Sequence, residues 1–319
     1  MKENFILYVF SILFGLSLGS CKKEIPVLEE PLPVAPESTD CPPLKVDTGY
    51  ILGDPSLYND YSAPYQYNAI VNPNNDNEIV FLEGFFPTKR LYYYNLTTHE
   101  KRMLIDESVF TSISWSKKDW ILFQRDADFN LYKMKSNGDS LTQLSFGQEW
   151  FRAQWNHAGD KYIAYYKNGN WPRTFIFNEE GVIIDSLSNW EHSSGTWSHP
   201  TYYLGFKMNE IMIMDIETKT VIKHLNLEKV VNFINWGSLN EIIYTQGNKT
   251  YNYNLLTNET KLIKFECYVN YQATSFSSDF SKLFFMKGVT SLQANGKYLR
   301  VGKIITMNKD GSNEQQINP

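Results

Sequence analysis

Short runs of aromatic and β-branched residues, separated by polar turns, cover the chain from about residue 50 onward. Clear examples are Trp120–Phe123, Tyr162–Tyr166, Glu241–Tyr244 and Lys282–Met286. Gly, Asn, Asp and Ser bound these runs, and no stretch places its apolar residues at the sustained spacing of a helix. The pattern therefore predicts an all-β domain built from short strands.

The same pattern returns about every 40 residues. An aromatic residue followed by a polar turn marks each of five units, which begin at Trp115, Trp155, Trp197, Trp236 and Phe276. A weaker sixth copy begins at Val71. Each unit continues with a third apolar run, namely Leu91–Tyr94, Asn130–Tyr132, Thr174–Phe177, Ile211–Met214, Tyr251–Tyr253 or Lys303–Met307. A polar turn and a short fourth strand close the unit.

Four short antiparallel strands in about 40 residues are typical of one blade of a β-propeller. Six such units predict a six-bladed β-propeller of four-stranded antiparallel blades over residues 49–319. Each sheet is apolar on both faces and cannot bury either face alone, so neighbouring blades are expected to stack around a common axis.

The repeat resembles that of TolB-like propellers. The resemblance is carried by a Trp-Ser turn, a hydrophobic strand, an Asp-Gly or Asn-Gly turn and a Leu-Thr-like ending. Trp115–Leu144 is the best copy and Phe276–Ile317 the next. The family's Ser-Pro-Asp-Gly turn is never complete in this chain, so the resemblance implies the fold more than a function.

The first 20 residues have the features of an export signal. Lys2 provides a positive start, and Phe5–Leu18 is an apolar run shorter than the roughly 20 residues that span a bilayer. The run ends in Leu-Gly-Ser-Cys21, which resembles the lipobox of bacterial lipoproteins. The resemblance implies cleavage after residue 20 and a lipid anchor on Cys21, so the membrane is an expected partner.

Residues 21–48 are rich in Pro and Glu and lack apolar periodicity, so we expect them to form an extended tether. Lys22 and Lys23 follow the lipidated cysteine in place of an Asp, which argues against retention at the inner membrane. The expected location is therefore the bacterial cell envelope, at the outer membrane. Residues 50–65 are a candidate for an additional strand at an outer edge of the ring.

Cys41 lies in the tether and Cys267 in the repeat region. An exported protein occupies an oxidising compartment, in which the two thiols can form a disulfide that joins the tether to the domain. Sequence alone does not show whether their Cα atoms come within about 7 Å of each other. Two free cysteines remain the alternative, which the sequence slightly favours.

Composition excludes one class of partner. The net charge is −5 and the pI is about 5.6, so the chain offers no basic surface for a nucleic-acid backbone. No metal site or cofactor is predicted either. Asp126–Asn130 lacks the Gly and the distant Glu of a calcium loop, and His157 and His199 share one face of the ring without a third ligand.

The mouth of the central channel is the predicted binding site. Residues just before each inner strand are expected to reach it, and the selected set is Trp150, Arg152, Trp190, His192, Tyr271 and Gln272. Such aromatic and hydrogen-bonding groups are common at binding hot spots. No catalytic residue is assigned.

The predicted function is a membrane-tethered, non-catalytic module that binds an envelope protein or a saccharide through one face of the ring. The alternative is a hydrolase or lyase on sugars or peptides, with carboxylates at the channel mouth. A purely structural envelope component is a third hypothesis.

Overall fold

The computed structural model describes residues 41, 46–47, 65–85, 88–147, 150–168, 171–187, 194–293 and 298–319. Every regular element in these ranges is a strand. The described ranges hold no helix that is both long and apolar enough to cross a membrane. The predicted signal peptide, Cys21, most of the tether and the segment 50–64 lie outside the described residues.

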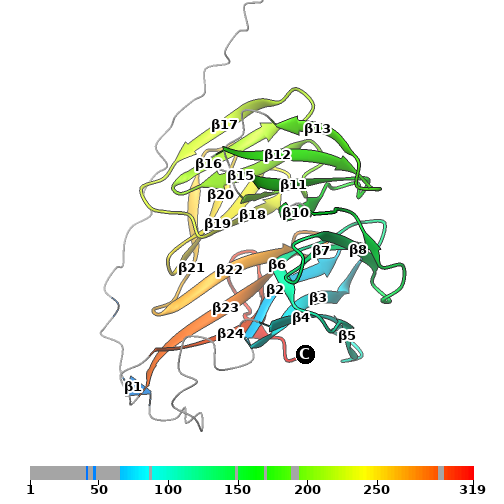
Figure 1. Cartoon of the computed structure of the whole chain (residues 1–319). Coiled ribbons are helices and arrows are strands. Elements are labelled where there is room, and N and C mark those ends of the chain that lie inside the picture. The colour runs from blue at the N-terminus through cyan, green and yellow to red at the C-terminus, as the bar shows by residue number, and fades with distance from the viewer. Residues whose placement is uncertain are drawn as a thin grey trace, which may run out of the picture.

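The strands form six sheets arranged around a common axis, each containing four consecutive antiparallel strands, which confirms the predicted six-bladed β-propeller (Figure 1). Blades one to three contain β2 (Tyr65–Asn72), β3 (Asn75–Phe85), β4 (Thr88–Asn95), β5 (Lys101–Ile105); β6 (Val109–Trp115), β7 (Trp120–Arg125), β8 (Leu131–Lys135), β9 (Thr142–Gln143); and β10 (Trp150–Trp155), β11 (Lys161–Asn168), β12 (Trp171–Asn178), β13 (Ile183–Leu187).

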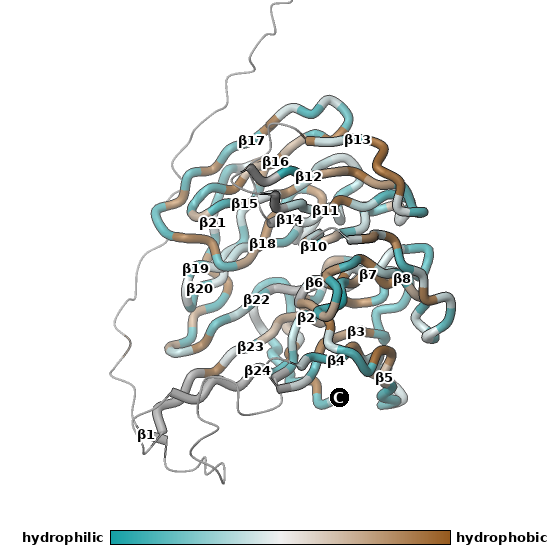
Figure 2. Tube along the Cα trace, viewed as in Figure 1, coloured by the Kyte–Doolittle hydropathy of each residue, from teal (hydrophilic) through white to brown (hydrophobic). Residues whose placement is uncertain are grey.

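Blades four to six contain β14 (Ser194–Thr196), β15 (Tyr202–Lys207), β16 (Glu210–Asp215), β17 (Thr220–Asn226); β18 (Phe233–Ser238), β19 (Glu241–Gln246), β20 (Lys249–Asn254), β21 (Thr260–Phe265); and β22 (Val269–Phe276), β23 (Lys282–Gln293), β24 (Tyr298–Asn308), β25 (Gln315–Gln316). The first strand of each blade is the innermost one. Figure 2 shows hydrophobic stretches within the strands and hydrophilic turns at the periphery.

The hydrophobic core is divided among the spaces between blades. Each buried cluster in the described ranges draws its residues from two neighbouring sheets. Between blades two and three, for example, Leu122 packs with Trp155, and the rings of Tyr162 and Phe177 stack with centroids 4.7 Å apart. Because strand side chains alternate between the two faces of a sheet, each blade supplies apolar residues to both neighbours.

The ring closes where blade one meets blade six. Val71 and Phe81 pack against Phe284 and Ile304 in one buried cluster. The Ile304 N–H donates to Oε1 of Gln66, 3.2 Å away. The four strands of blade one are consecutive in the chain, as are β22–β25 of blade six, so side-chain packing and hydrogen bonds join the two ends of the repeat.

Two points of the predicted tether are attached to blade six. Cys41 forms a disulfide with Cys267, with 5.5 Å between their Cα atoms, so these thiols are not free. The short strand β1 (Val46–Asp47) pairs in parallel with the last two residues of β23. Figure 1 shows β1 beside the far end of the long β23–β24 hairpin. The chain is therefore joined to its propeller before the first blade begins.

Candidate functional site

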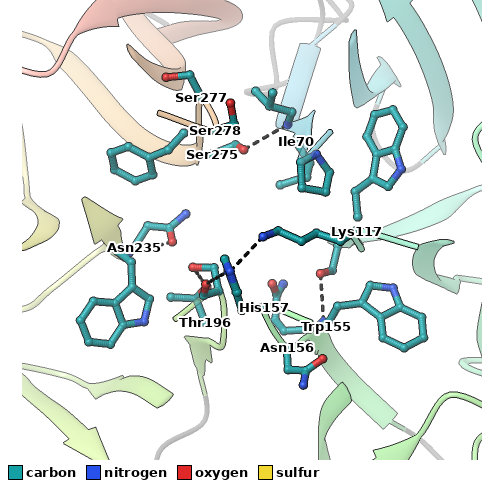
Figure 3. A pocket seen from close by; sticks show the side chains of 18 of the residues that line it. Ile70, Lys117, Trp155, Asn156, His157, Thr196, Asn235, Ser275, Ser277 and Ser278 are labelled. Carbon is teal, nitrogen blue, oxygen red and sulfur yellow. Dashed lines mark hydrogen bonds between the residues drawn. The ribbon is translucent and has the colours of Figure 1, made fainter. Parts of the chain in front are cut away.

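A cavity of about 200 Å³ lies at one end of the central channel. Residues from all six blades line it, and they come from the last positions of the inner strands and from the turns that follow them (Figure 3). The six inner strands therefore end at the cavity. The five inner strands other than β14 contain six to eight residues and cover roughly 20 Å or more, so they begin at the opposite mouth.

The repeated turn after each inner strand shapes this mouth. In blade two, Ser116 Oγ accepts a hydrogen bond from the backbone N–H of Trp120, 3.1 Å away. Ser277 Oγ accepts the equivalent bond from Lys282 in blade six at 2.9 Å. In blade three, the Asn156 side chain accepts bonds from three backbone N–H groups of its turn. The Trp-Ser or Trp-Asn motif of the sequence thus builds the rim of the cavity.

Lys117 and His157 meet within the cavity. The Lys117 side chain extends across the opening toward His157, and 3.0 Å separates Nζ from Nε2 (Figure 3). The other ring nitrogen of His157, Nδ1, lies 3.0 Å from the carbonyl oxygen of Ser198. A carbonyl only accepts and an ammonium only donates, so the proton is on Nδ1 and the ring is neutral. Burial lowers the pKa of His157, the Lys117 charge lowers it further, and the Ser198 carbonyl opposes both.

The charged and the partly exposed apolar side chains of the cavity come from different blades. Blades two to four supply Lys117, Asn156 and His157, together with hydroxyl groups. Blades six and one supply four partly exposed apolar residues, namely Phe276 at the end of β22, Phe280 in the turn that follows, and Ile70 and Pro73 near the end of β2. Blade six also supplies Ser275, Ser277 and Ser278. None of the lining residues within the described part of the chain is an Asp or Glu. The site therefore combines one full positive charge with an apolar wall.

Trp150 and Tyr271 do not reach this site. The Trp150 side chain is 3% exposed, and its ring packs against Tyr166, Phe175 and Phe177 in the core between blades two and three. Tyr271 is 1% exposed and belongs to the core between blades five and six. Strand alternation turns both rings between blades, so neither is available to a ligand in this structure.

The other predicted binding residues occupy different positions. Arg152 is exposed near the start of β10, and its positive φ of 53° falls at the register shift between Phe151 and Gln154. Gln272 lies half-buried in the first half of β22. Both are on the side where the inner strands begin, away from the cavity. Trp190 and His192 lie outside the described residues.

His199 has a structural role. Its Nδ1 accepts hydrogen bonds from the N–H groups of Thr201 and Tyr202 at 3.0 and 3.1 Å, and its Nε2 lies 3.2 Å from the Leu239 carbonyl oxygen. The ring stacks on Tyr202 and contacts Trp236. Both ring nitrogens are therefore engaged with protein groups.

The acidic segment around Asp128 forms the turn between β7 and β8. Asp128 accepts hydrogen bonds from the Asn130 N–H at 3.0 Å and from the Tyr132 hydroxyl at 2.6 Å. A search of the described ranges finds no group of three or more His, Cys, Asp or Glu side chains placed to hold a metal ion.

Sequence reasoning identified the turns that form the cavity but assigned the binding site to the other ends of the inner strands. The cavity residues outside the predicted set include Lys117, the second residue after the repeated Trp115. The signal that could have found it is the repeat itself, because equivalent turns from every blade must meet at one mouth of a closed ring.

No protein-family model matches the chain, and no curated protein matches it. Among solved structures, the β-propeller domain of Cps50 (Swd1) from Myceliophteria thermophila is 14% identical, with a TM-score of 0.52 over 81% of this chain and 88% of that one. A protein assigned as TolB from Agrobacterium tumefaciens is 13% identical, with a TM-score of 0.52 over 70% and 86% of the respective chains. An oligogalacturonate lyase in complex with manganese is 10% identical, with a TM-score of 0.51 over 80% and 77%. These likenesses show that the chain has the β-propeller fold found in TolB and in other proteins.

Proposed function

We propose that this chain is a lipid-anchored, non-catalytic binding module of the bacterial cell envelope. It recognises a protein or a saccharide through the face of the ring that carries the cavity. The observation that carries the proposal is the cavity itself, which presents Lys117, hydroxyl and amide groups beside an apolar wall. Polar groups placed in a partly apolar hollow are typical of ligand sites.

The attachment of the tether supports this assignment. Cys267 lies two residues before β22 begins at Val269, whereas β22 ends at the cavity with Phe276. The disulfide to Cys41 therefore joins the tether to the face of the ring opposite the cavity. The anchored tether and the cavity are therefore on opposite faces of the ring, which leaves the cavity face free of the tether's attachment point.

The absence of acidic groups from the cavity lining favours binding over the alternative of a hydrolase or lyase. General acid–base catalysis by carboxylates needs at least one Asp or Glu within hydrogen-bond reach of the substrate. Among the described residues that line the cavity, the titratable side chains are Lys117 and His157. A neutral His157 held between a carbonyl and an ammonium is engaged on both nitrogens.

Site-specific photo-crosslinking in intact cells tests the proposal. A photoreactive phenylalanine analogue replaces Phe280 at the cavity. In a matched variant, the same analogue replaces Met208 in the turn between β15 and β16, on the opposite face of the ring. The Met208 side chain is 70% exposed, so a partner on that face could reach it. We expect a discrete adduct from position 280 and none from position 208. Adducts that form only at position 208 would assign recognition to the other face and refute the proposal.

The anchor is tested separately with Cys21→Ser. We expect this variant to move from the membrane fraction to the soluble fraction, because removal of the thiol removes the attachment point for lipid. Membrane association that persists unchanged in the variant contradicts the lipid anchor.

A further inference from the structure

The cavity contains hydrogen-bond donors that have no acceptor among the described residues. Lys117 donates to His157, and an ammonium has three N–H groups, so two remain without a protein acceptor among the described residues. Ser114 Oγ accepts from the Trp155 N–H at 3.0 Å, and Ser275 Oγ accepts from the Val71 N–H at 3.0 Å. A hydroxyl that accepts in this way keeps its own proton for donation.

Two acceptors near Lys117 are occupied. The carbonyl oxygen of the Asn156 side chain already receives three backbone N–H groups, and the His157 Nε2 atom faces the Lys117 ammonium. With no carboxylate in the described lining, the site suits an anion that accepts hydrogen bonds.

The wall opposite Lys117 suits an apolar group. Ile70, Pro73, Phe276 and Phe280 come from blades one and six and retain partial exposure. The volume of about 200 Å³ is below the roughly 300–1,000 Å³ of pockets for drug-sized ligands, so it suits a group of about one residue. The occupant thus combines one anionic end with one compact apolar substituent.

A saccharide fits this lining less well. Carboxylates, which accept hydrogen bonds from sugar hydroxyls, are absent from the described lining residues. Sugar rings also stack on open aromatic faces, but Trp115, Trp155 and Trp236 are 6%, 3% and 1% exposed. Figure 3 shows the Trp155 ring directed away from the opening.

We infer that the cavity binds the carboxyl-terminal residue of a partner polypeptide that ends in an apolar side chain. Lys117 and the hydroxyls of Ser114 and Ser275 hold the terminal carboxylate, and the wall formed by Ile70 and Phe276 receives the side chain. The inference rests on the proposed function and specifies its ligand.

Calorimetric titration of the full chain in detergent tests this inference. The probes are acetyl-Gly-Gly-Ala-Leu with a free carboxylate and the same peptide with a terminal amide. We expect the amide to bind at least about tenfold more weakly, because a hydrogen bond to a charged group contributes about 1.5–3 kcal/mol. Equal binding of the two peptides, or no detectable binding of either, overturns the inference.

Two variants separate the role of Lys117 from a general loss of charge. Lys117→Gln is expected to weaken binding of the free-acid peptide at least about tenfold. The matched control is Lys118→Gln, because Lys118 pairs with Glu179 at 2.6 Å outside the cavity. It should leave binding unchanged within about twofold, a factor that corresponds to ~0.4 kcal/mol. An equal loss in both variants overturns the assignment to Lys117.

Galacturonate is the third probe and distinguishes the source of the carboxylate. Binding of galacturonate without binding of the peptide overturns the inference in favour of an acidic saccharide. If the peptide fails while position 280 still crosslinks to a partner, the carboxyl-terminal ligand is refuted and the proposed function survives. Failure of both experiments refutes both.

Discussion

Removal of the disulfide between Cys41 and Cys267 should destabilise the propeller substantially. The bond joins residues 226 positions apart, so it closes almost the whole repeat region into one loop. The chain-entropy relation gives an upper limit of about 5 kcal/mol at 25 °C for a loop of this length. We expect Cys41→Ser to lower the free energy of unfolding by about 2–5 kcal/mol, the range found for native disulfides.

Urea unfolding followed by tryptophan fluorescence measures this loss. Cys41→Ser, Cys267→Ser and the double variant should lose the same free energy, because each removes the same constraint on the unfolded chain. Two-residue pairing of β1 with β23 remains in all three variants, so the comparison isolates the covalent bond. The slope of the free energy against urea concentration should rise slightly without the bond, since the unfolded chain exposes more surface.

Reduction of the wild-type protein provides the control. Wild type treated with dithiothreitol should match the double variant, and the double variant should not respond to reduction. An unchanged unfolding midpoint in reduced wild type would show that the loop is not closed by this bond, and the reasoning from chain entropy would fail.

Two further predictions concern a turn and a titration. Gly311→Ala should destabilise the protein by about 3 kcal/mol in thermal unfolding, because φ is +87° and the new Cβ would lie 2.1 Å from the Ile263 carbonyl oxygen. The control is Gly247→Ala, at φ +60° in open space, which should cost only about 1 kcal/mol. Equal losses in the two variants would contradict the clash at Gly311. In NMR spectra, the His157 ring should titrate below the ordinary histidine pKa of about 6.5. Lys117→Gln should raise the titration midpoint of His157, because it removes the nearby positive charge. A midpoint at or above about 6.5 in wild type contradicts the assigned geometry. Because the folded pKa is lowered, the unfolded state binds the proton more readily, and His157 contributes a loss of stability as the pH falls below about 6.5.

The blades could be predicted because their signals are local. Three of the predicted runs fall within observed strands: Trp120–Phe123 in β7, Tyr162–Tyr166 in β11 and Lys282–Met286 in β23. The aromatic and β-branched residues of such a run, and the polar turns that bound it, define a strand without reference to the rest of the chain. The period of the repeated aromatic positions then set the number of blades. Closure follows because sheets that are apolar on both faces can be buried only against one another.

The residues that line the cavity could not be predicted from the sequence, for a reason that Trp150 illustrates. The face of a strand to which a side chain points depends on its register, and β10 carries a register shift immediately after Phe151. A shift of one residue exchanges channel and core positions. The sequence showed aromatic residues near the inner strands, but only the folded sheet determined that Trp150 is buried between blades.

Local sequence signals were enough to predict the all-β class, the six repeating units and the turns that follow their inner strands. Tertiary folding sets which residues meet across the ring. It joined Cys41 to Cys267, brought Lys117 to His157 and placed the apolar residues of blades one and six opposite them. These results differ because of distance along the chain. Strands and turns depend on neighbouring residues. The contacts across the ring join separate segments, whose relative positions are set only when all six blades pack around one axis.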